Sequence, residues 1–317
     1  MILKEYGGYI ELDTYKLPML HDDAIALNSG RNALAYLLEA KNIKKLVIPY
    51  FLCDSVPELL KRENVSYRFY HIDINFRPEK MSLNDDEWLY IVNFYGQLDR
   101  EYLGSLKKLY RRIIIDNAQN YFEAPLEDTD VLYTCRKFFG VADGAFLYSD
   151  TKLKRELLSD ESFDRMHFLL GRFERPASEF YNEYVVNNHL FAKEPIKKMS
   201  VLTNNLLHGI DYDFVKQRRS DNFNIFYEAF KNINRLTLYK TEGAFMYPLY
   251  LKFGSEIRKK LQLEKIYIPT LWPAVFDICK TDMLEYDMAL NILPLPVDQR
   301  YDSDDIEFII DRIKAEL

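Results

Sequence analysis

The first half of the chain alternates between short apolar runs and segments in which apolar residues recur at helical spacing. The helical spacing covers Ala33–Leu38, Val56–Arg62 and Glu101–Tyr110, and Asp22 and Asp23 are expected to cap the first of these helices. The apolar runs between them are typical of strands: Leu46–Tyr50, Tyr67–Ile72, Leu89–Phe94, Ile113–Ile115, Val131–Tyr133 and Ala145–Tyr148. Strands that alternate with helices favour right-handed crossovers and a largely parallel sheet.

Beyond residue 150 the pattern becomes mostly helical and then mixed again. Residues 151–235 predict helices, including a long one from about Phe214 to Phe230, and the chain closes with a helix from Asp304. The strands predicted in the last part are Leu236–Tyr239, Met246–Phe253, Ile266–Ile268 and Ile292–Val297. With 317 residues, and roughly 150 per domain as the usual size, we expect an α/β protein of two domains with a boundary near residues 205–212.

Composition and charge narrow the class of protein without naming a function. Lys and Arg total 42 against 49 Asp and Glu, a net charge of −7, so we expect no nucleic acid partner, because such binding needs clustered cations. The chain has no apolar run of about 18 residues and no leader that is basic and then apolar, which predicts no membrane partner and a cytoplasmic location. Its 5 His and 3 Cys form no ligand spacing, so no metal is expected.

The candidate chemistry lies directly after the predicted strands, because ligands of open parallel sheets bind beyond the carboxyl ends of the strands. Asp116 ends a run that is apolar at every position, and Lys137 follows the next run. Ser29 and Gly30 precede the first helix, where free backbone N–H groups suit a phosphate. Each feature alone fits a turn, a cap or a surface residue. Together they supply the amine, the carboxylate and the phosphate cradle that pyridoxal phosphate requires.

Five ordered segments resemble the sugar aminotransferases of the DegT/StrS type, within fold type I of the pyridoxal phosphate enzymes. Two are fairly specific: Asp116–Gln119 is similar to the D-x-A-Q signature, and Lys137–Ala145 resembles K-x-x-x-x-G-[ED]-G-G. The other three are weaker: Asn28–Leu34 resembles S-G-T-x-A-L, Val47–Tyr50 resembles the family's V-I-V-P-S strand end, and Val92–Gln97 resembles its G-Q-P turn.

The resemblance implies the fold, the cofactor and the partners. It implies a three-layer α/β/α large domain with a mostly parallel sheet over residues 1–205, and a smaller C-terminal α/β domain over residues 206–317. The cofactor would be pyridoxal 5′-phosphate. The partners would be a small-molecule amino donor such as glutamate, a keto-sugar acceptor linked to a nucleotide, and a second copy of the chain in a homodimer with shared active sites.

The same resemblance assigns the catalytic pair. Lys137 would form the Schiff base with the cofactor and move the proton, and Asp116 would pair with the pyridinium nitrogen. Gln119 would hydrogen-bond near the 3-hydroxyl of the ring. Arg136, next to the lysine, either favours the neutral amine by charge repulsion or points away and pairs with an acid.

The phosphate would be held by Gly30 and Arg31, with a hydroxyl from Thr134. Arg31 stands where the family has Thr, and a long cation still neutralises a phosphate. At Lys197 and Lys198 the family carries an N-x-R-M motif that reaches into the partner subunit's site, so these lysines are a second departure.

Aromatic side chains would line the cofactor ring. Tyr50 or Phe51 would cover its face, since Cys53 occupies the family's usual stacking position, and Tyr95 is a candidate for the pocket wall. The paired arginines of the long helix, Arg218 and Arg219, are expected on a solvated face.

Two other functions remain open. One is a pyridoxal phosphate-dependent sugar dehydratase. Relatives that dehydrate have histidine in place of the lysine, or added iron–sulfur cysteines, whereas Lys137 is present here and the cysteines do not cluster. The other is a protein with the cofactor fold but no transaminase activity that acts as a binding or assembly module, which the departures at Arg31 and Lys197 favour.

Overall fold

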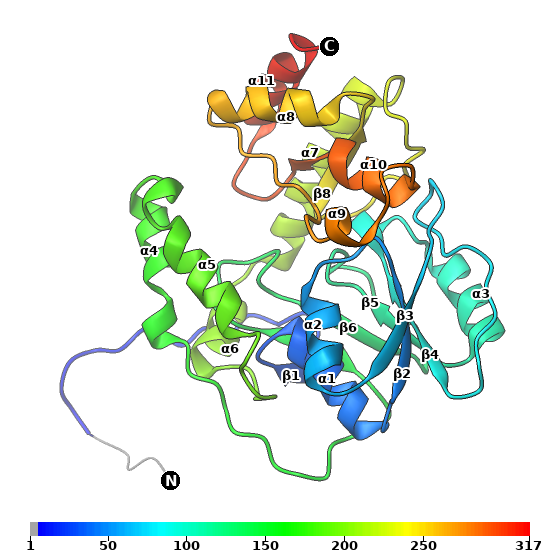
Figure 1. Cartoon of the computed structure of the whole chain (residues 1–317). Coiled ribbons are helices and arrows are strands. Elements are labelled where there is room, and N and C mark those ends of the chain that lie inside the picture. The colour runs from blue at the N-terminus through cyan, green and yellow to red at the C-terminus, as the bar shows by residue number, and fades with distance from the viewer. Residues whose placement is uncertain (1–5) are drawn as a thin grey trace.

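A seven-stranded sheet forms the centre of the molecule in a computed structural model that describes residues 6–317 (Figure 1). The strand order is β1-β7-β6-β5-β4-β2-β3. Strands β2 to β6 run parallel to one another, and β7 pairs antiparallel with both β6 and β1. The strands are β1 (Ile25–Leu27), β2 (Lys45–Pro49), β3 (Ser66–Tyr70), β4 (Glu87–Val92), β5 (Ile113–Asp116), β6 (Asp130–Thr134) and β7 (Ala145–Tyr148).

The predicted α/β class and the mostly parallel sheet are confirmed, and the six predicted strands of the first half are all present. Strand β1 was not predicted, because three residues carry too little pattern. The cap predicted at Asp22 and Asp23 is wrong: β1 lies between them and the first helix, and Ser29 caps that helix by accepting from the N–H of Asn32 at 3.2 Å.

Helices cover both faces of this sheet. Helices α1 (Gly30–Ala40) and α2 (Ser55–Arg62) lie on one face, and α3 (Arg100–Tyr110) lies on the other (Figure 1). A 3₁₀ turn, η1 (Phe94–Gly96), follows β4. The residues of β5 are buried at every position, as expected of a strand covered on both sides.

A helical arm follows the sheet. After the 3₁₀ turn η2 (Phe163–Arg165), helices α4 (His167–Glu174) and α5 (Tyr181–Leu190) stand away from the sheet, joined through η3 (Ala177–Glu179) (Figure 1). Helix α6 (Val201–Leu207) leads back beside the sheet. The domain boundary predicted after residue 205 stays a prediction, although α6 runs across it.

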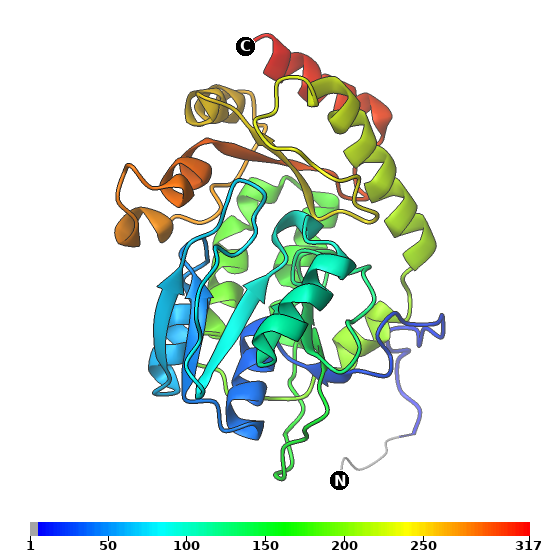
Figure 2. The same cartoon turned by 90° about the vertical axis from the view of Figure 1, so that its right-hand side faces the viewer.

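The C-terminal part is built on a two-stranded antiparallel sheet of β8 (Met246–Tyr250) and β9 (Ile292–Pro296). The long helix α7 (Tyr212–Phe230) packs against α11 (Ser303–Lys314) and extends beside the large sheet (Figure 2). The remaining helices are α8 (Gly254–Leu263), α9 (Val275–Ile278) and α10 (Leu284–Asn291). None of the helices described over residues 6–317 is both long and apolar enough to cross a membrane.

Two predicted strands of this part are wrong. The segment Leu236–Tyr239 is irregular because the N–H of Tyr239 donates to the Oε1 of Gln97, 2.8 Å away, instead of to a neighbouring strand. The segment Ile266–Ile268 is also irregular, since the N–H of Ile266 donates to the carbonyl of Leu261 and closes the end of α8.

Candidate functional site

Lys137 lies in a turn directly after β6. The N–H groups of Phe138 and Phe139 both donate to the carbonyl of Cys135, at 3.0 and 2.9 Å, and so close the turn. The side chain of Lys137 is exposed, and its Nζ lies 5.4 Å from the centre of the Phe245 ring. Within the described part of the chain the amine forms no ion pair. It is therefore open to a ligand.

Asp116 ends β5, the parallel neighbour of β6, so it emerges at the same edge of the sheet as the Lys137 turn. Its Oδ2 accepts a hydrogen bond from the hydroxyl of Tyr90 at 2.6 Å, and its Oδ1 accepts from the N–H of Ala118 at 2.8 Å. Burial raises the pKa of Tyr90 well above its usual range, and the charge of Asp116 adds to this. The hydroxyl thus stays protonated and fixes the carboxylate.

The start of α1 meets the end of β6. A Cβ added to Gly30 would lie 3.7 Å from the Cβ of Thr134, so the two predicted phosphate ligands are neighbours. The first N–H groups of a helix lack carbonyl partners within the helix. They favour an anion, as does the helix dipole.

Arg31 adds a cation to the start of α1. Its side chain is 14% exposed, and its Nη2 lies 3.8 Å from the Oε2 of Glu58. Its Nη1 is buried and has no hydrogen-bond partner among residues 6–317. A buried donor left without an acceptor costs about 1–3 kcal/mol. An anionic ligand at the start of α1 would satisfy it.

Arg136 points away from the site. Its guanidinium donates to the side-chain oxygen of Asn188 and lies over the ring of Phe191, 4.8 Å from the ring centre. Both residues lie at the α5 side of the molecule. Burial lowers the pKa of Arg136 to about 10. Of the two alternatives for Arg136, the one that points away holds, with an amide rather than an acid as its partner.

Gln119 and Tyr95 are brought together. The N–H of Tyr95 donates to the Oε1 of Gln119 at 2.7 Å, and Tyr95 has a φ of 54°. The ring of Tyr95 is 0% exposed and its hydroxyl has no partner among the described residues. Burial raises the pKa of Tyr95. Gln119 thus holds the turn after β4 close to the end of β5.

The two candidates for covering the ring occupy different surroundings. Tyr50 is half-buried, and its ring stacks on Phe69 with 4.7 Å between centres. Phe51 is 0% exposed and packs against aromatic rings of both parts of the molecule: Phe76, Phe94 and Trp272. Tyr50 is the less enclosed of the two.

The sequence did not indicate how the segment after Lys137 is anchored. The buried carboxylate of Asp143 accepts from the N–H and the Oγ–H of Ser200, at 2.8 and 2.7 Å, and from the hydroxyl of Thr203. Burial raises the pKa of Asp143, and these bonds oppose the rise. The acidic position in the resembled motif is the signal that could have identified it. This network fastens the Lys137 segment to α6.

Of the lysines expected near a partner subunit, Lys197 has its side chain paired within its own chain, and Lys198 is exposed. The Nζ of Lys197 lies 2.5 Å from a carboxylate oxygen of Glu194 and 3.3 Å from one of Asp160. The backbone N–H of Lys198 donates to the carbonyl of Leu158 at 2.8 Å.

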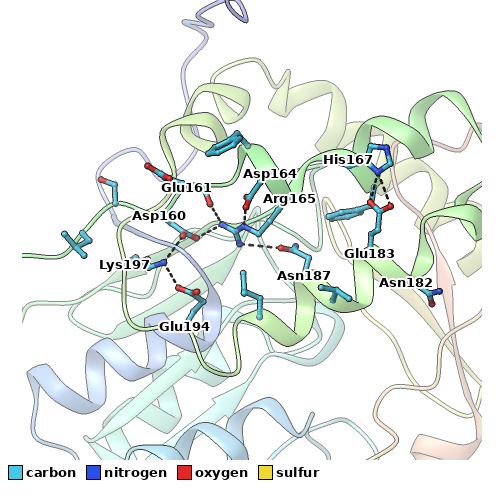
Figure 3. A pocket seen from close by; sticks show the side chains of 16 residues that line it. Asp160, Glu161, Asp164, Arg165, His167, Asn182, Glu183, Asn187, Glu194 and Lys197 are labelled. Carbon is cyan, nitrogen blue, oxygen red and sulfur yellow. Dashed lines mark hydrogen bonds and ion pairs between the residues drawn. The ribbon is translucent and has the colours of Figure 1, made fainter. Parts of the chain in front are cut away.

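A pocket of about 800 Å³ lies beside these lysines, between the segment 158–165 and helices α4 and α5. Figure 3 shows Arg165 at its centre, with Asp160 and Asn187 as hydrogen-bond partners. The lining does not include Lys137 or Asp116. The pocket therefore belongs to the helical arm and not to the site at the strand ends.

Arg219, expected on a solvated face, is buried at 1% exposure, and that prediction is wrong. It lies on α7 and donates to the carbonyl of Phe138, next to Lys137, at 3.2 Å. The spacing of a single helix does not reveal such a partner, which is 81 residues away.

No protein-family model and no curated protein matches the chain. Solved structures do match. A sugar aminotransferase of Streptococcus pneumoniae in its PLP form has a TM-score of 0.63 and 14% identity, over 93% of this chain and 88% of that chain. The sugar aminotransferase CalS13 of Micromonospora echinospora has a TM-score of 0.62 and 13% identity, over 93% and 87%. DesI, solved with its TDP-sugar product, has a TM-score of 0.63 and 13% identity, over 92% and 80%.

These likenesses establish the fold. The protein has the α/β architecture of PLP-dependent sugar aminotransferases, with a mostly parallel central sheet and flanking helices.

Proposed function

We propose that the protein is a pyridoxal phosphate-dependent aminotransferase that moves an amino group from a donor such as glutamate to a nucleotide-linked keto-sugar. One observation carries this proposal. The exposed amine of Lys137, the fixed carboxylate of Asp116 and the unpartnered Nη1 of Arg31 lie around one edge of the sheet. They do so in a fold that is shared with sugar aminotransferases.

The residues present fit the phosphate of this cofactor. The unpartnered, buried Nη1 of Arg31 needs an anionic acceptor, and the start of α1 at Gly30 lies against Thr134. We assign the phosphate to Gly30, Arg31 and Thr134, because N–H, guanidinium and hydroxyl donors suit its oxygens.

The residues around the ring fit as well. We assign the pyridine nitrogen to Asp116, the 3-hydroxyl region to Gln119, and the face of the ring to Tyr50 or Phe51. Tyr95 forms a wall behind Gln119. Tyr50 is the stronger candidate for the ring face, since Phe51 is completely enclosed.

When bound, pyridoxal phosphate supplies an aldehyde for amino groups and a ring that withdraws electrons. Lys137 would hold the group by its aldehyde, and once the amino group of the donor has displaced its Nζ, the freed amine would take up and return a proton at the substrate carbon. Asp116 holds a proton on the ring nitrogen, and the hydroxyl of Tyr90 keeps the carboxylate in place. The ring of Phe245 lies beside the amine and packs against the ring of Phe138, which gives the amine an apolar wall on that side.

The similar structures support the substrate class, since they are described as sugar aminotransferases, and one was solved with a TDP-sugar product. A homodimer with shared active sites is supported by the helical arm, which exposes large apolar side chains: Leu170, Phe173, Tyr181 and Val186. The cytoplasmic location stays a prediction.

The test is an absorption spectrum of the purified protein with added pyridoxal phosphate, recorded before and after adding glutamate. We expect a visible band that shifts toward the aminated cofactor, and no such band in the Lys137→Ala variant. Lys152, which lies outside the site, offers a matched control as Lys152→Ala. A wild-type protein that stays colourless would contradict the proposal and favour the binding or assembly module.

A further inference from the structure

Arg219 is a buried cation that reaches from α7 to the turn that carries Lys137. Its Nε–H donates to the Oε1 of Gln299 at 2.9 Å. Its Nη1 donates to the carbonyls of Ala244, at 3.0 Å, and Phe245, at 3.5 Å, and its Nη2 donates to the carbonyl of Phe138, at 3.2 Å. Its Cζ lies over the Phe138 ring, 4.6 Å from the ring centre. One side chain thus joins three segments that are distant in the sequence.

This cation has no ion-pair partner among residues 6–317. Within the described residues, no carboxylate lies at ion-pair distance from Arg219, and Asp298, whose charge influences it, is paired with Arg300 at 2.6 Å. Burial lowers the pKa of Arg219 to about 10, so the guanidinium remains charged at neutral pH. An apolar side chain of similar size fills buried space at a lower free-energy cost than an ion. Packing alone therefore does not account for an arginine here.

Two of its acceptors adjoin the amine of Lys137. The Phe138 carbonyl belongs to the residue that follows the lysine. The Ala244 carbonyl belongs to the residue before Phe245, over whose ring the Nζ of Lys137 lies at 5.4 Å. The rings of Phe138 and Phe245 have 5.9 Å between their centres. Arg219 thus fixes both the segment that carries the amine and the aromatic wall beside it.

We infer that Arg219 is a positioning residue for Lys137, which holds the lysine turn and the Phe245 wall in register across the two parts of the molecule. The inference rests on the proposed function for the role of the amine. A pyridoxal phosphate anchored by its phosphate presents its aldehyde at one place only. The amine must therefore be held at that place, and a small displacement slows the encounter.

The test compares two reagents that react with Lys137 in protein freed of bound cofactor. The first is pyridoxal phosphate, trapped by borohydride reduction and located by mass spectrometry. The second is acetic anhydride, which has no anchor and needs no particular position of the amine. In Arg219→Met we expect the rate with pyridoxal phosphate to fall on the order of tenfold, and the rate with acetic anhydride to stay the same. Arg219→Lys keeps the charge but cannot bridge the three segments, so we expect a smaller fall.

Matched controls separate positioning from loss of the fold. Arg218 lies on the same helix, and its guanidinium covers the ring of Phe214. In Arg218→Met both rates should stay at wild-type values. If Arg219→Met does not fold, Gln299→Leu is informative. It removes one of the two donors to the Phe138 carbonyl and the acceptor of the Arg219 Nε–H, but keeps Arg219 itself, and it should lower the first rate alone.

The possible outcomes are distinct. Two results would overturn the positioning role and leave the proposed function intact. In one, a folded Arg219→Met reacts with pyridoxal phosphate at the wild-type rate. In the other, the rates with pyridoxal phosphate and with acetic anhydride change by the same factor. A wild-type protein in which pyridoxal phosphate does not select Lys137 would instead overturn the proposed function.

Discussion

Two buried arginines lie on different sides of the Lys137 turn, and their hydrogen bonds differ. Arg31 is 14% exposed, and its Nη1 has no partner among the residues that the structure describes. Arg219 is 1% exposed, and its donors reach four acceptors of the chain itself. A buried donor without an acceptor is unfavourable unless a ligand accepts its hydrogen bond, whereas a donor with a partner in the chain stabilises the fold.

This difference divides the surroundings of the turn into two sides. The cofactor side consists of Arg31, Asp116 and Lys137, and the anchor side consists of Asp143 and Arg219. If the division is correct, substitutions on the cofactor side change ligand binding or activity and barely change stability. Substitutions on the anchor side lower the free energy of unfolding.

The largest effect is expected on the cofactor side, for Asp116→Asn. The neutral amide cannot hold a proton on the ring nitrogen, so we expect kcat of the aminotransferase reaction to fall on the order of 10²–10³-fold. The thermal midpoint should stay close to that of wild type, because the amide oxygen can accept from the N–H of Ala118 while the amide NH2 donates to the hydroxyl oxygen of Tyr90. Steady-state kinetics and thermal unfolding measure the two quantities. The control Tyr90→Phe removes one of the two hydrogen-bond donors to Asp116 and should reduce kcat less. Unchanged activity in Asp116→Asn would mean that Asp116 does not belong to the cofactor side.

Asp143→Ala gives the largest expected effect on stability. The carboxylate accepts three hydrogen bonds from Ser200 and Thr203, and its removal leaves buried donors without partners. We expect the free energy of unfolding to fall by about 3 kcal/mol. Asp143→Asn should cost less, because burial already raises the pKa of this carboxyl and so disfavours its charge. Denaturation with urea measures both, and an equal loss in the two variants would contradict this account.

The two arginines give the most direct comparison. Arg219→Met leaves the carbonyl of Ala244 without its donor, and we expect a loss of about 2 kcal/mol of stability. Arg31→Met removes an unsatisfied donor, so stability should hold or rise. Affinity for pyridoxal phosphate should fall about tenfold or more in Arg31→Met, since a charge-assisted bond to an anion contributes about 1.5–3 kcal/mol.

Thermal unfolding without cofactor and a binding titration distinguish the two variants. If Arg31→Met is as unstable as Arg219→Met and binds the cofactor normally, Arg31 belongs to the anchor side and the division fails.

The sequence predicts the cofactor side better than the anchor side, because the first is made of local signals. Asp116 ends an apolar run, and Lys137 begins a motif of nine residues, so each can be recognised within its own segment. Thr203 and Arg219 act through partners that are 60 and 81 residues away. No local pattern marks such contacts, and Arg219 next to Arg218 has the pattern of a solvated face.

The fold shows the same division between local and distant causes. Strands of four to six residues inside the large sheet are predicted, because their apolar runs are buried on both faces. Leu236–Tyr239 has a strand-like run as well, yet Gln97 of the other part of the molecule takes its backbone hydrogen bonds. A contact between distant parts overrides the local preference there.

The smallest expected effect concerns His21, a third buried basic side chain, which is 6% exposed. Its Nε2 lies 2.8 Å from the carbonyl of Tyr121, and its Nδ1 lies 3.1 Å from the hydroxyl of Tyr148. Burial lowers the pKa of His21 from its usual 6.5, against the raising effects of the Tyr121 carbonyl and the charge of Asp23. His21 thus accommodates burial by losing its charge, whereas Arg219, with a pKa of about 10, keeps its charge at neutral pH.

A lowered pKa in the folded state means that the unfolded chain binds the proton at a higher pH. The stability that neutral His21 contributes is therefore complete above about pH 6.5 and is lost as the pH falls through the lowered folded value. Between pH 7 and 5, the free energy of unfolding of wild type should fall relative to His21→Gln by up to about 1 kcal/mol. Urea denaturation of both proteins at each pH measures this difference. Burial raises the pKa of Asp143, which gives a contribution of opposite sign, but this contribution is the same in both proteins and cancels in the difference. Parallel pH profiles would mean that the pKa of His21 is the same in the folded and the unfolded chain, and that burial does not remove the charge of the ring.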